Sequence, residues 1–222
     1  MAWFLDRLRE GKLLTMTEIY DTVGFKSIVG VSINGRKAIA GPVCVSAVSL
    51  DPYLKVQYTQ SAKELTEEEC VKISEDIKLR ATTLSIGWGL VEAFEKGHDK
   101  PLLDAMSSCL VEFSIYRPVT AIVIDGFSYR PDTVPISLYN SRIPIIRADG
   151  ASEFLEPCIA ASIVAKAARG TLMNILHEEF PEYGWASNKG FATKLHMEAI
   201  KMYGWSGHHR PHKDRNQIKE EM

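Results

Sequence analysis

The chain has 222 residues, of which 45% are hydrophobic and 24% are charged, and its formal net charge at pH 7 is −2. This balance is typical of a globular protein with one domain and short accessory segments. It excludes a strongly basic, histone-like binder, so any contact with nucleic acid must come from a local patch of cations.

The cysteines and the N-terminus indicate the compartment. Four cysteines, at positions 44, 70, 109 and 158, show no Cys-x-x-Cys spacing, which favours reduced, packed thiols. No run of about eighteen apolar residues occurs, and the first ten residues carry too many charges for a signal-peptide core. We therefore expect a cytoplasmic or otherwise intracellular protein that is not secreted and does not contact a membrane.

The first predicted elements are helical. Apolar residues at helical spacing predict helix, turn, helix over residues 1–27. An amphipathic helix with Trp3 and Phe4 could dock a protein partner, although packing on its own domain is the commoner outcome. Residues 27–56 then predict an antiparallel hairpin whose second strand covers 39–50.

The remaining chain alternates helices with short strands. Four segments have helical periodicity: 66–79, 88–96, 102–113 and the alanine-rich 160–176. Two apolar runs, 121–124 and 145–147, are typical of strands buried on both faces. Pro, Gly and Asn interrupt 181–190 before a last helix at 193–203. An α/β fold with a mixed sheet is the economical arrangement.

Asp125 is the strongest candidate for chemistry that pattern alone provides. It ends the apolar run 121–124, and α/β proteins place ligand and metal sites at the carboxyl ends of such strands. The alternative is a polar residue that only terminates the strand.

Three segments resemble a known family. Residues 30–43 read G-V-S-I-N-G-R-K-A-I-A-G-P-V, which resembles the opening of type 2 ribonuclease H (ribonuclease HII), roughly G-V-D-E-x-G-R-G-P-x-A-G-P-V. Residues 160–166, A-A-S-I-V-A-K, and 183–196, Y-G-W-A-S-N-K-G-F-A-T-K-L-H, are similar to two later elements of that family. The resemblance spans about 28–212. It implies a ribonuclease H-like mixed sheet flanked by helices, with a C-terminal helical subdomain that clamps a duplex.

The resemblance also implies a division of the chain. The expected parts are an N-terminal helical extension 1–27, a ribonuclease HII-like core 28–170, a C-terminal helical subdomain 171–212 and a charged tail 213–222.

The catalytic carboxylates of this family are only partly retained. Ser32 and Ile33 stand where the family has Asp and Glu, whereas Asp125 matches the metal-binding Asp of a V-D-G element. Hydrolysis of a phosphodiester by two metal ions needs carboxylate oxygens, which Ser and Ile do not have. The resemblance therefore implies a site that has lost its first two acids.

The last metal-binding Asp of the family lies in a G-D element before its A-A-S-I helix. Asp149 fills this position only if the chain carries an insertion, because the ungapped position falls on Ser152, with Glu153 or Glu156 as neighbours. We take Asp125 and Asp149 as the remnants of the catalytic and metal site. No cofactor is firmly expected; Mg²⁺ or Mn²⁺ would serve an active form.

The binding residues are better retained. The family's G-R-G loop approaches the ribose 2′-OH, by which proteins distinguish RNA from DNA; Gly35 and Arg36 remain, and Lys37 replaces the second Gly. Phe191 replaces a Tyr that stacks at the RNA–DNA junction, so it can stack but cannot donate a hydrogen bond. The candidate nucleic-acid-binding residues are Gly35, Arg36, Lys37, Lys63, Ser162, Lys166, Lys189 and Phe191.

Three hypotheses follow. The leading one is a catalytically inactive or strongly impaired relative, a pseudoenzyme, that binds an RNA–DNA hybrid or a duplex with an embedded ribonucleotide. The second is an active metal-dependent ribonuclease H with a site rebuilt from Asp125, Asp149 and another acid such as Glu153. The third is a protein-interaction or assembly subunit that docks through residues 1–27.

A histidine tract near the C-terminus has two interpretations. His208, His209 and His212 lie close enough to suggest a metal tract. The family has a similar stretch after its last helix, so a structural or phosphate-facing role is the favoured interpretation.

Overall fold

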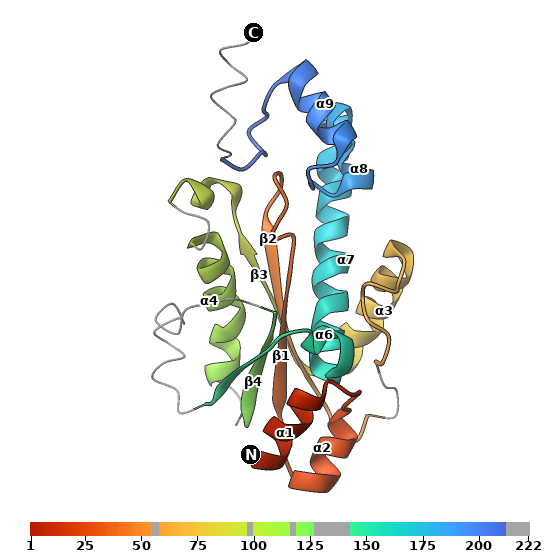
Figure 1. The fold of residues 1–222 in the computed structure, drawn as a ribbon, viewed down its shortest axis with the longest axis vertical. Helices are drawn as coiled ribbons and strands as arrows, with labels where there is room; N and C mark the ends of the chain where they lie inside the picture. Colours follow the sequence, from red (N-terminus) through yellow and green to blue (C-terminus); the bar gives the residue numbers. More distant parts are fainter. Residues whose placement is uncertain (55–57, 97–99, 116–118, 127–142, 212–222) are drawn as a thin grey trace.

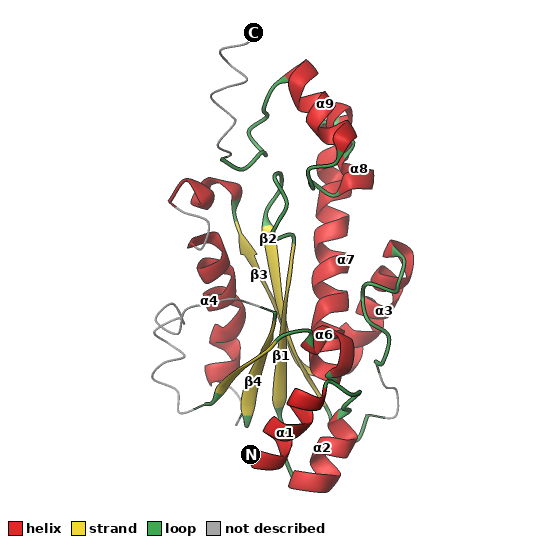
Figure 2. Cartoon of the chain, viewed as in Figure 1, coloured by secondary structure: helices red, strands yellow, loops and turns green. Residues whose placement is uncertain are grey.

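The structure is a computed structural model that describes residues 1–54, 58–96, 100–115, 119–126 and 143–211. Its centre is a five-stranded sheet in the order β3-β2-β1-β4-β5, with helices on both faces (Figures 1 and 2). The strands are β1 (Ile28–Asn34), β2 (Val43–Leu50), β3 (Ala81–Gly89), β4 (Ala121–Asp125) and β5 (Ile145–Ala148). The expected α/β fold with a mixed sheet flanked by helices is confirmed.

Helices and 3₁₀ turns make up most of the remaining described chain. The α-helices are α1 (Ala2–Glu10), α2 (Met16–Val23), α3 (Glu67–Arg80), α4 (Lys100–Ile115), α6 (Ala151–Phe154), α7 (Glu156–Glu179), α8 (Trp185–Asn188) and α9 (Lys194–Tyr203). The 3₁₀ helices are η1 (Val91–Lys96) and η3 (Pro181–Tyr183). Helix α7 packs on β1 and β2 and is itself covered by α3, whereas α4 covers β2 and β3 from the opposite face.

The strand register places the candidate acid next to the altered strand. β1 and β2 form the expected antiparallel hairpin, although β2 begins at Val43 rather than at residue 39. β4 runs parallel to β1, with Val31 opposite Ile124. Ser32 and Asp125 are the next residues of the two strands, so they reach the same edge of the sheet.

The prediction of a helix over residues 88–96 is wrong at its start, where the chain is still in β3. Only Val91–Lys96 is helical, as a 3₁₀ helix. Trp88 belongs to β3, where it pairs with Cys44, and only the 3₁₀ helix η1 follows. A Cβ on Gly87 would lie 1.9 Å from the carbonyl oxygen of Ala105 in α4. Close packing of α4 on β3 therefore depends on this glycine, and the long-range pairing overrides the local helical period.

Local signals predicted α3, α4, α7 and α9, whereas the short helices α6 and α8 were not predicted. Thr66 caps α3 with a capping box: its hydroxyl accepts the Glu69 N–H at 3.2 Å, and the Glu69 carboxylate accepts the Thr66 N–H at 2.8 Å. The alanine-rich helix is longer than expected, since α7 covers Glu156–Glu179. By length and composition α7 would pass as a membrane span, a test that the central helix of a globular fold also passes.

The N-terminal segment packs on its own domain. Phe4, Leu14 and Ile19 are fully buried in the core that α7 covers. The buried Glu156 carboxylate accepts the N–H of Met16 at 2.8 Å, which ties α2 to the start of α7. The apolar stripe of residues 1–27 therefore faces inward, which leaves little of it for a partner.

The cysteines and the C-terminal end complete the description. All four cysteines are free and buried, as their spacing predicts. The predicted tail 213–222 and His212 lie outside the described residues.

Candidate functional site

A hollow of about 280 Å³ lies at the carboxyl end of β4, beside β1; we call it the Asp125 pocket. Elements distant in sequence meet there, because the parallel strands β1 and β4 end at one edge and α7 runs alongside the sheet, packed on β1. Six of the predicted site residues line it: Ser32, Ile33, Lys63, Asp125, Ser162 and Lys166. Ser152 also lines it, so the position that an ungapped comparison indicates is present at the pocket.

The donor set of the Asp125 pocket does not fit a two-metal centre. Asp125 is the single carboxylate among its lining residues. Ser32 and Ser152 are buried, with 5% and 7% exposure, and contribute hydroxyls. In the described part of the chain, no group of three or more His, Cys, Asp or Glu side chains could hold a metal ion. Hard divalent cations need more anionic oxygens than this, so no reaction step through a metal follows from these residues.

Asp149 does not line the pocket. Its carboxylate is exposed and accepts two hydrogen bonds from Arg147, from Nε at 2.9 Å and from Nη2 at 2.8 Å. The Arg147 guanidinium holds the pKa of Asp149 below its usual range. Asp149 thus follows Ala148, the cross-strand partner of Asp125, but its carboxylate is bonded to Arg147 and does not line the pocket.

The two nearby glutamates are also engaged. Glu153 forms an ion pair with Lys63, and the hydrogen bond that Lys63 donates to Glu153 raises the pKa of Lys63. Glu156 accepts the backbone N–H groups of Met16 and Tyr58, the latter at 3.1 Å, and its burial raises its pKa. Neither glutamate lines the Asp125 pocket.

Lys166 shapes one wall of the pocket. Its ammonium group donates to the carbonyl oxygens of Ala62 and Leu65, each at 2.7 Å. These two hydrogen bonds hold the connection that carries Lys63, whose side chain remains 75% exposed. Lys166 therefore acts as a positioning cation, while Lys63 is the cation that solvent reaches.

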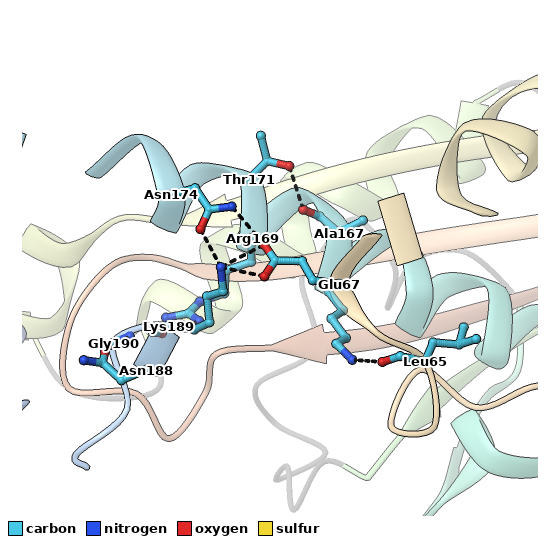
Figure 3. A network of polar contacts seen from close by, with 10 residues as sticks. Leu65, Glu67, Ala167, Arg169, Thr171, Asn174, Asn188, Lys189 and Gly190 are labelled. Atoms are coloured by element: carbon cyan, nitrogen blue, oxygen red, sulfur yellow. Dashed lines mark hydrogen bonds and ion pairs between the residues drawn. The ribbon is translucent and has the colours of Figure 1, made fainter. Parts of the chain in front are cut away.

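Lys189 has an intramolecular partner. Its ammonium lies 2.7 Å from the Glu67 carboxylate and donates to the Asn174 side-chain oxygen at 2.5 Å (Figure 3). Asn174 in turn donates to Glu67 at 3.0 Å. The sequence predicts Lys189 as a nucleic-acid-binding residue; in the structure its charge links the turn after α8 to α3 and α7.

Arg169 is a buried cation that sequence reasoning missed. It is 1% exposed and donates to three carbonyl oxygens: Pro42 at 2.9 Å, Lys189 at 2.8 Å and Ala40 at 3.1 Å. Burial lowers the pKa of Arg169 to about 10. The sequence signal that could have revealed it is an arginine within a largely apolar helix, α7. Through its hydrogen bonds, Arg169 joins the β1–β2 connection to the turn at Lys189.

Gly35 lies directly against this arginine. Its φ is +80°, and a Cβ would lie 2.0 Å from the Arg169 Nε. Arg36 and Lys37 follow at the exposed tip of the connection. Phe191 is 40% exposed, and its ring centroid lies 5.7 Å from the Arg169 guanidinium carbon. We call Arg169, the backbone at 40–42 and 189 that it bonds, and Gly35 the Arg169 frame. Two cations and an aromatic ring next to this frame in the sequence are exposed to solvent.

The histidines form a buried hydrogen-bond network. Ser206 N–H donates to His209 Nδ1 at 2.9 Å, which assigns the His209 proton to Nε2 and lets it donate to His196 Nε2 at 3.1 Å. The Trp185 indole donates to the same nitrogen at 3.0 Å, and His196 Nδ1 donates to the Phe191 carbonyl at 2.8 Å. Burial lowers the pKa of His196. This network is structural and holds Phe191 in place.

The fold defines the class of protein first. A mixed sheet in this order, covered by α7 and α4, is a ribonuclease H-like fold. Ribonuclease H2 from Pyrococcus horikoshii OT3 matches with a TM-score of 0.71 at 18% identity, over 88% of this chain and 98% of that chain. A chain of the PCNA:RNase HII complex from Archaeoglobus fulgidus matches with a TM-score of 0.68 at 16% identity, over 84% and 95%.

The sequence comparisons then define the family. The profile described as Ribonuclease HII matches residues 29–215. Ribonuclease HII of Caldanaerobacter subterraneus subsp. tengcongensis is 34% identical over 215 residues, which are 94% of this chain and 83% of that protein. The chain belongs to the ribonuclease HII family.

Proposed function

We propose that this chain is a catalytically inactive or strongly impaired member of its family that binds nucleic acid, either an RNA–DNA hybrid or a duplex with an embedded ribonucleotide. One observation carries the proposal. The Asp125 pocket contains one carboxylate together with Lys63, Lys166 and several hydroxyls.

The loss of catalysis follows from the chemistry of phosphodiester hydrolysis. Two divalent cations about 4 Å apart orient the water and stabilise the leaving oxygen, and carboxylates hold both ions. Loss of an outer-shell partner already costs about tenfold to a hundredfold. The resemblance implies that Ser32 and Ile33, which line the pocket, stand in place of direct ligands, so the expected cost is larger. Asp149 and Glu153, the acids that a rebuilt site would need, are engaged in ion pairs.

The ability to bind follows from the retained frame. Arg36, Lys37 and Lys63 are exposed cations that can contact phosphates. Phe191 is exposed over the Arg169 guanidinium and can stack on a base or a sugar. These exposed cations are the local source of positive charge that a chain with a net charge of −2 needs for such a contact.

A single assay with two readouts tests the proposal. Purified protein is titrated into a labelled duplex with one ribonucleotide, and binding and cleavage are scored with Mg²⁺ and with Mn²⁺. We expect salt-sensitive binding without cleavage, and the same binding for Asp125→Asn. Metal-dependent cleavage that disappears in Asp125→Asn would overturn the loss of catalysis. Absence of binding to any duplex at low salt would overturn the nucleic-acid function.

A further inference from the structure

A second hollow, of about 260 Å³, lies on the other side of the β1–β2 connection; we call it the Arg210 pocket. Arg36, Lys37, Phe94 and Arg210 line it, so it shares no lining residue with the Asp125 pocket. The segment after α9 passes over the β1–β2 connection toward η1 (Figure 1). Two backbone bonds fix it there, from Arg210 N–H to the Ile39 carbonyl and from Gly41 N–H to the His208 carbonyl, each at 2.8 Å.

Arg210 is the unusual group of this pocket. It is 3% exposed, and its guanidinium donates to the carbonyls of Gly41 at 2.8 Å and Arg36 at 3.1 Å. Its guanidinium carbon lies 4.3 Å from the centroid of the Phe94 ring. Its Nη2 is buried and has no hydrogen-bond partner among the described residues. A buried charged donor without an acceptor is costly, so this nitrogen points to a ligand that supplies an acceptor.

The charges around the pocket specify the sign of that ligand. No carboxylate is among its lining residues, while Arg36 and Lys37 add two exposed cations. Burial and the nearby Arg169 lower the pKa of Arg210 to about 9, so Arg210 still carries its charge at neutral pH. An anion with several oxygens would satisfy Nη2 and relieve the repulsion between the two buried guanidinium groups.

We propose that the Arg210 pocket binds a phosphate group, and that this group is a backbone phosphodiester of the bound duplex. The anion chemistry stands on Arg210 and its neighbours alone, whereas the source of the phosphate rests on the proposed function. The β1–β2 connection carries Asn34 at the Asp125 pocket and Arg36 at the Arg210 pocket. One nucleic-acid strand that follows this connection would reach both pockets.

The first experiment tests the pocket without nucleic acid. The side-chain Nε–H signal of Arg210 is followed by NMR while inorganic phosphate is added at constant ionic strength. We expect a saturable shift in the unaltered protein. The surface double variant Arg36→Gln/Lys37→Gln should bind phosphate about tenfold more weakly, the effect of about one lost charge-assisted hydrogen bond. Lys12→Gln and Lys194→Gln, at exposed lysines elsewhere, are matched controls.

The second experiment measures duplex affinity against salt concentration. Arg36→Gln/Lys37→Gln should reduce the slope of log affinity against log salt by about one for each lost phosphate contact. Arg210→Lys keeps the charge but loses the forked donor pair, and its fold is checked by circular dichroism. We expect it to weaken binding of phosphate and of the duplex.

The outcomes separate this inference from the proposed function. A phosphate-dependent Arg210 shift without duplex binding would support the pocket and overturn both the nucleic-acid function and the backbone phosphodiester as its ligand. Duplex binding with an unchanged salt slope and no Arg210 shift would overturn the pocket and leave the nucleic-acid function intact. If neither a phosphate-dependent Arg210 shift nor duplex binding is seen, the Arg210 pocket and the nucleic-acid function are both overturned.

Discussion

The Asp125 pocket and the frame around Arg169 are neighbours in this fold, but polar groups do different work in them. The pocket lies at the ends of β1 and β4, and Asp125 is its single carboxylate, beside Ser32, Ile33 and Ser152. The frame keeps an arginine that is hydrogen-bonded to three backbone carbonyls. Side chains at strand ends can change without disturbing the sheet, whereas a buried cation that joins two backbone segments is part of the fold.

The largest effect is expected where the frame is broken. Arg169→Ala would leave three carbonyls without their donor and a cavity behind Gly35. We expect a loss of about 3–5 kcal/mol in the free energy of unfolding, measured by chemical denaturation. Arg147→Ala removes an exposed arginine and should leave stability unchanged. Equal stability of the two variants would refute the structural role of Arg169.

Adding acids to the Asp125 pocket tests whether that region can still bind a metal ion. The triple variant Ser32→Asp, Ile33→Glu, Ser152→Asp adds three carboxylates to the wall that carries Asp125. We expect Mn²⁺ affinity to rise by roughly a hundredfold, measured by calorimetry. The same variant with Asp125→Asn is the control. A folded triple variant that gains no affinity for Mn²⁺ would show that the pocket has lost its geometry as well as its acids.

Gly35 tests how tightly the frame is packed. Gly35→Ala places a Cβ 2.0 Å from the Arg169 Nε at a φ of +80°. We expect a loss of about 2–4 kcal/mol, from left-handed strain together with overpacking. Gly11→Ala has a similar φ of +65° with no atom within 4 Å, so it isolates the strain at about 1 kcal/mol. If the two losses are equal, Arg169 yields to the added methyl group and the frame is softer than we infer.

The smallest effect concerns pH. Burial lowers the pKa of His196 below its ordinary value of 6.5, so the unfolded chain takes up this proton first as the pH falls. The contribution of the neutral His196 is therefore present above about pH 6.5 and is lost as the pH falls toward its folded pKa, by at most about 1.4 kcal/mol per pH unit. Thermal melting between pH 7.5 and 5 measures this slope.

A variant is needed to isolate that slope. Glu156 has a raised pKa, so its contribution has the opposite sign: it is present at low pH and is lost as the pH rises through its folded pKa. His196→Gln should be less stable overall but should lose the decline between pH 6.5 and the folded pKa. A decline of the same size in His196→Gln would assign it to another group.

Several parts of the molecule could be predicted from local patterns. Thr66 and Glu69 form a capping box because the residues that make it are close in sequence. The apolar run that ends at Asp125 forms a buried strand because its composition suits no solvent-exposed position. The resemblance to ribonuclease HII, and with it the fold and most of the Asp125 pocket, also rests on short motifs.

Other parts depend on partners distant in sequence. Residues 81–89 form a strand because β2 offers an edge and α4 covers it, which no local period shows. Lys189 was predicted to bind nucleic acid, and in the structure it forms an ion pair with Glu67 of α3. Asp149 was predicted to join Asp125, but the turn before α6 directs it to Arg147 and places Ser152 at the pocket.

The sequence by itself determined the class of fold, the family resemblance and the presence of Ser32 and Ile33 where that resemblance implies two acids, because these depend on residue identity and spacing along the chain. Only the tertiary structure decided which charges are neutralised and which remain unpaired. Lys189 meets a carboxylate, whereas Arg210 retains a buried nitrogen without a partner among the described residues. Desolvation and the approach of distant segments set that difference, and neither is encoded in a local pattern.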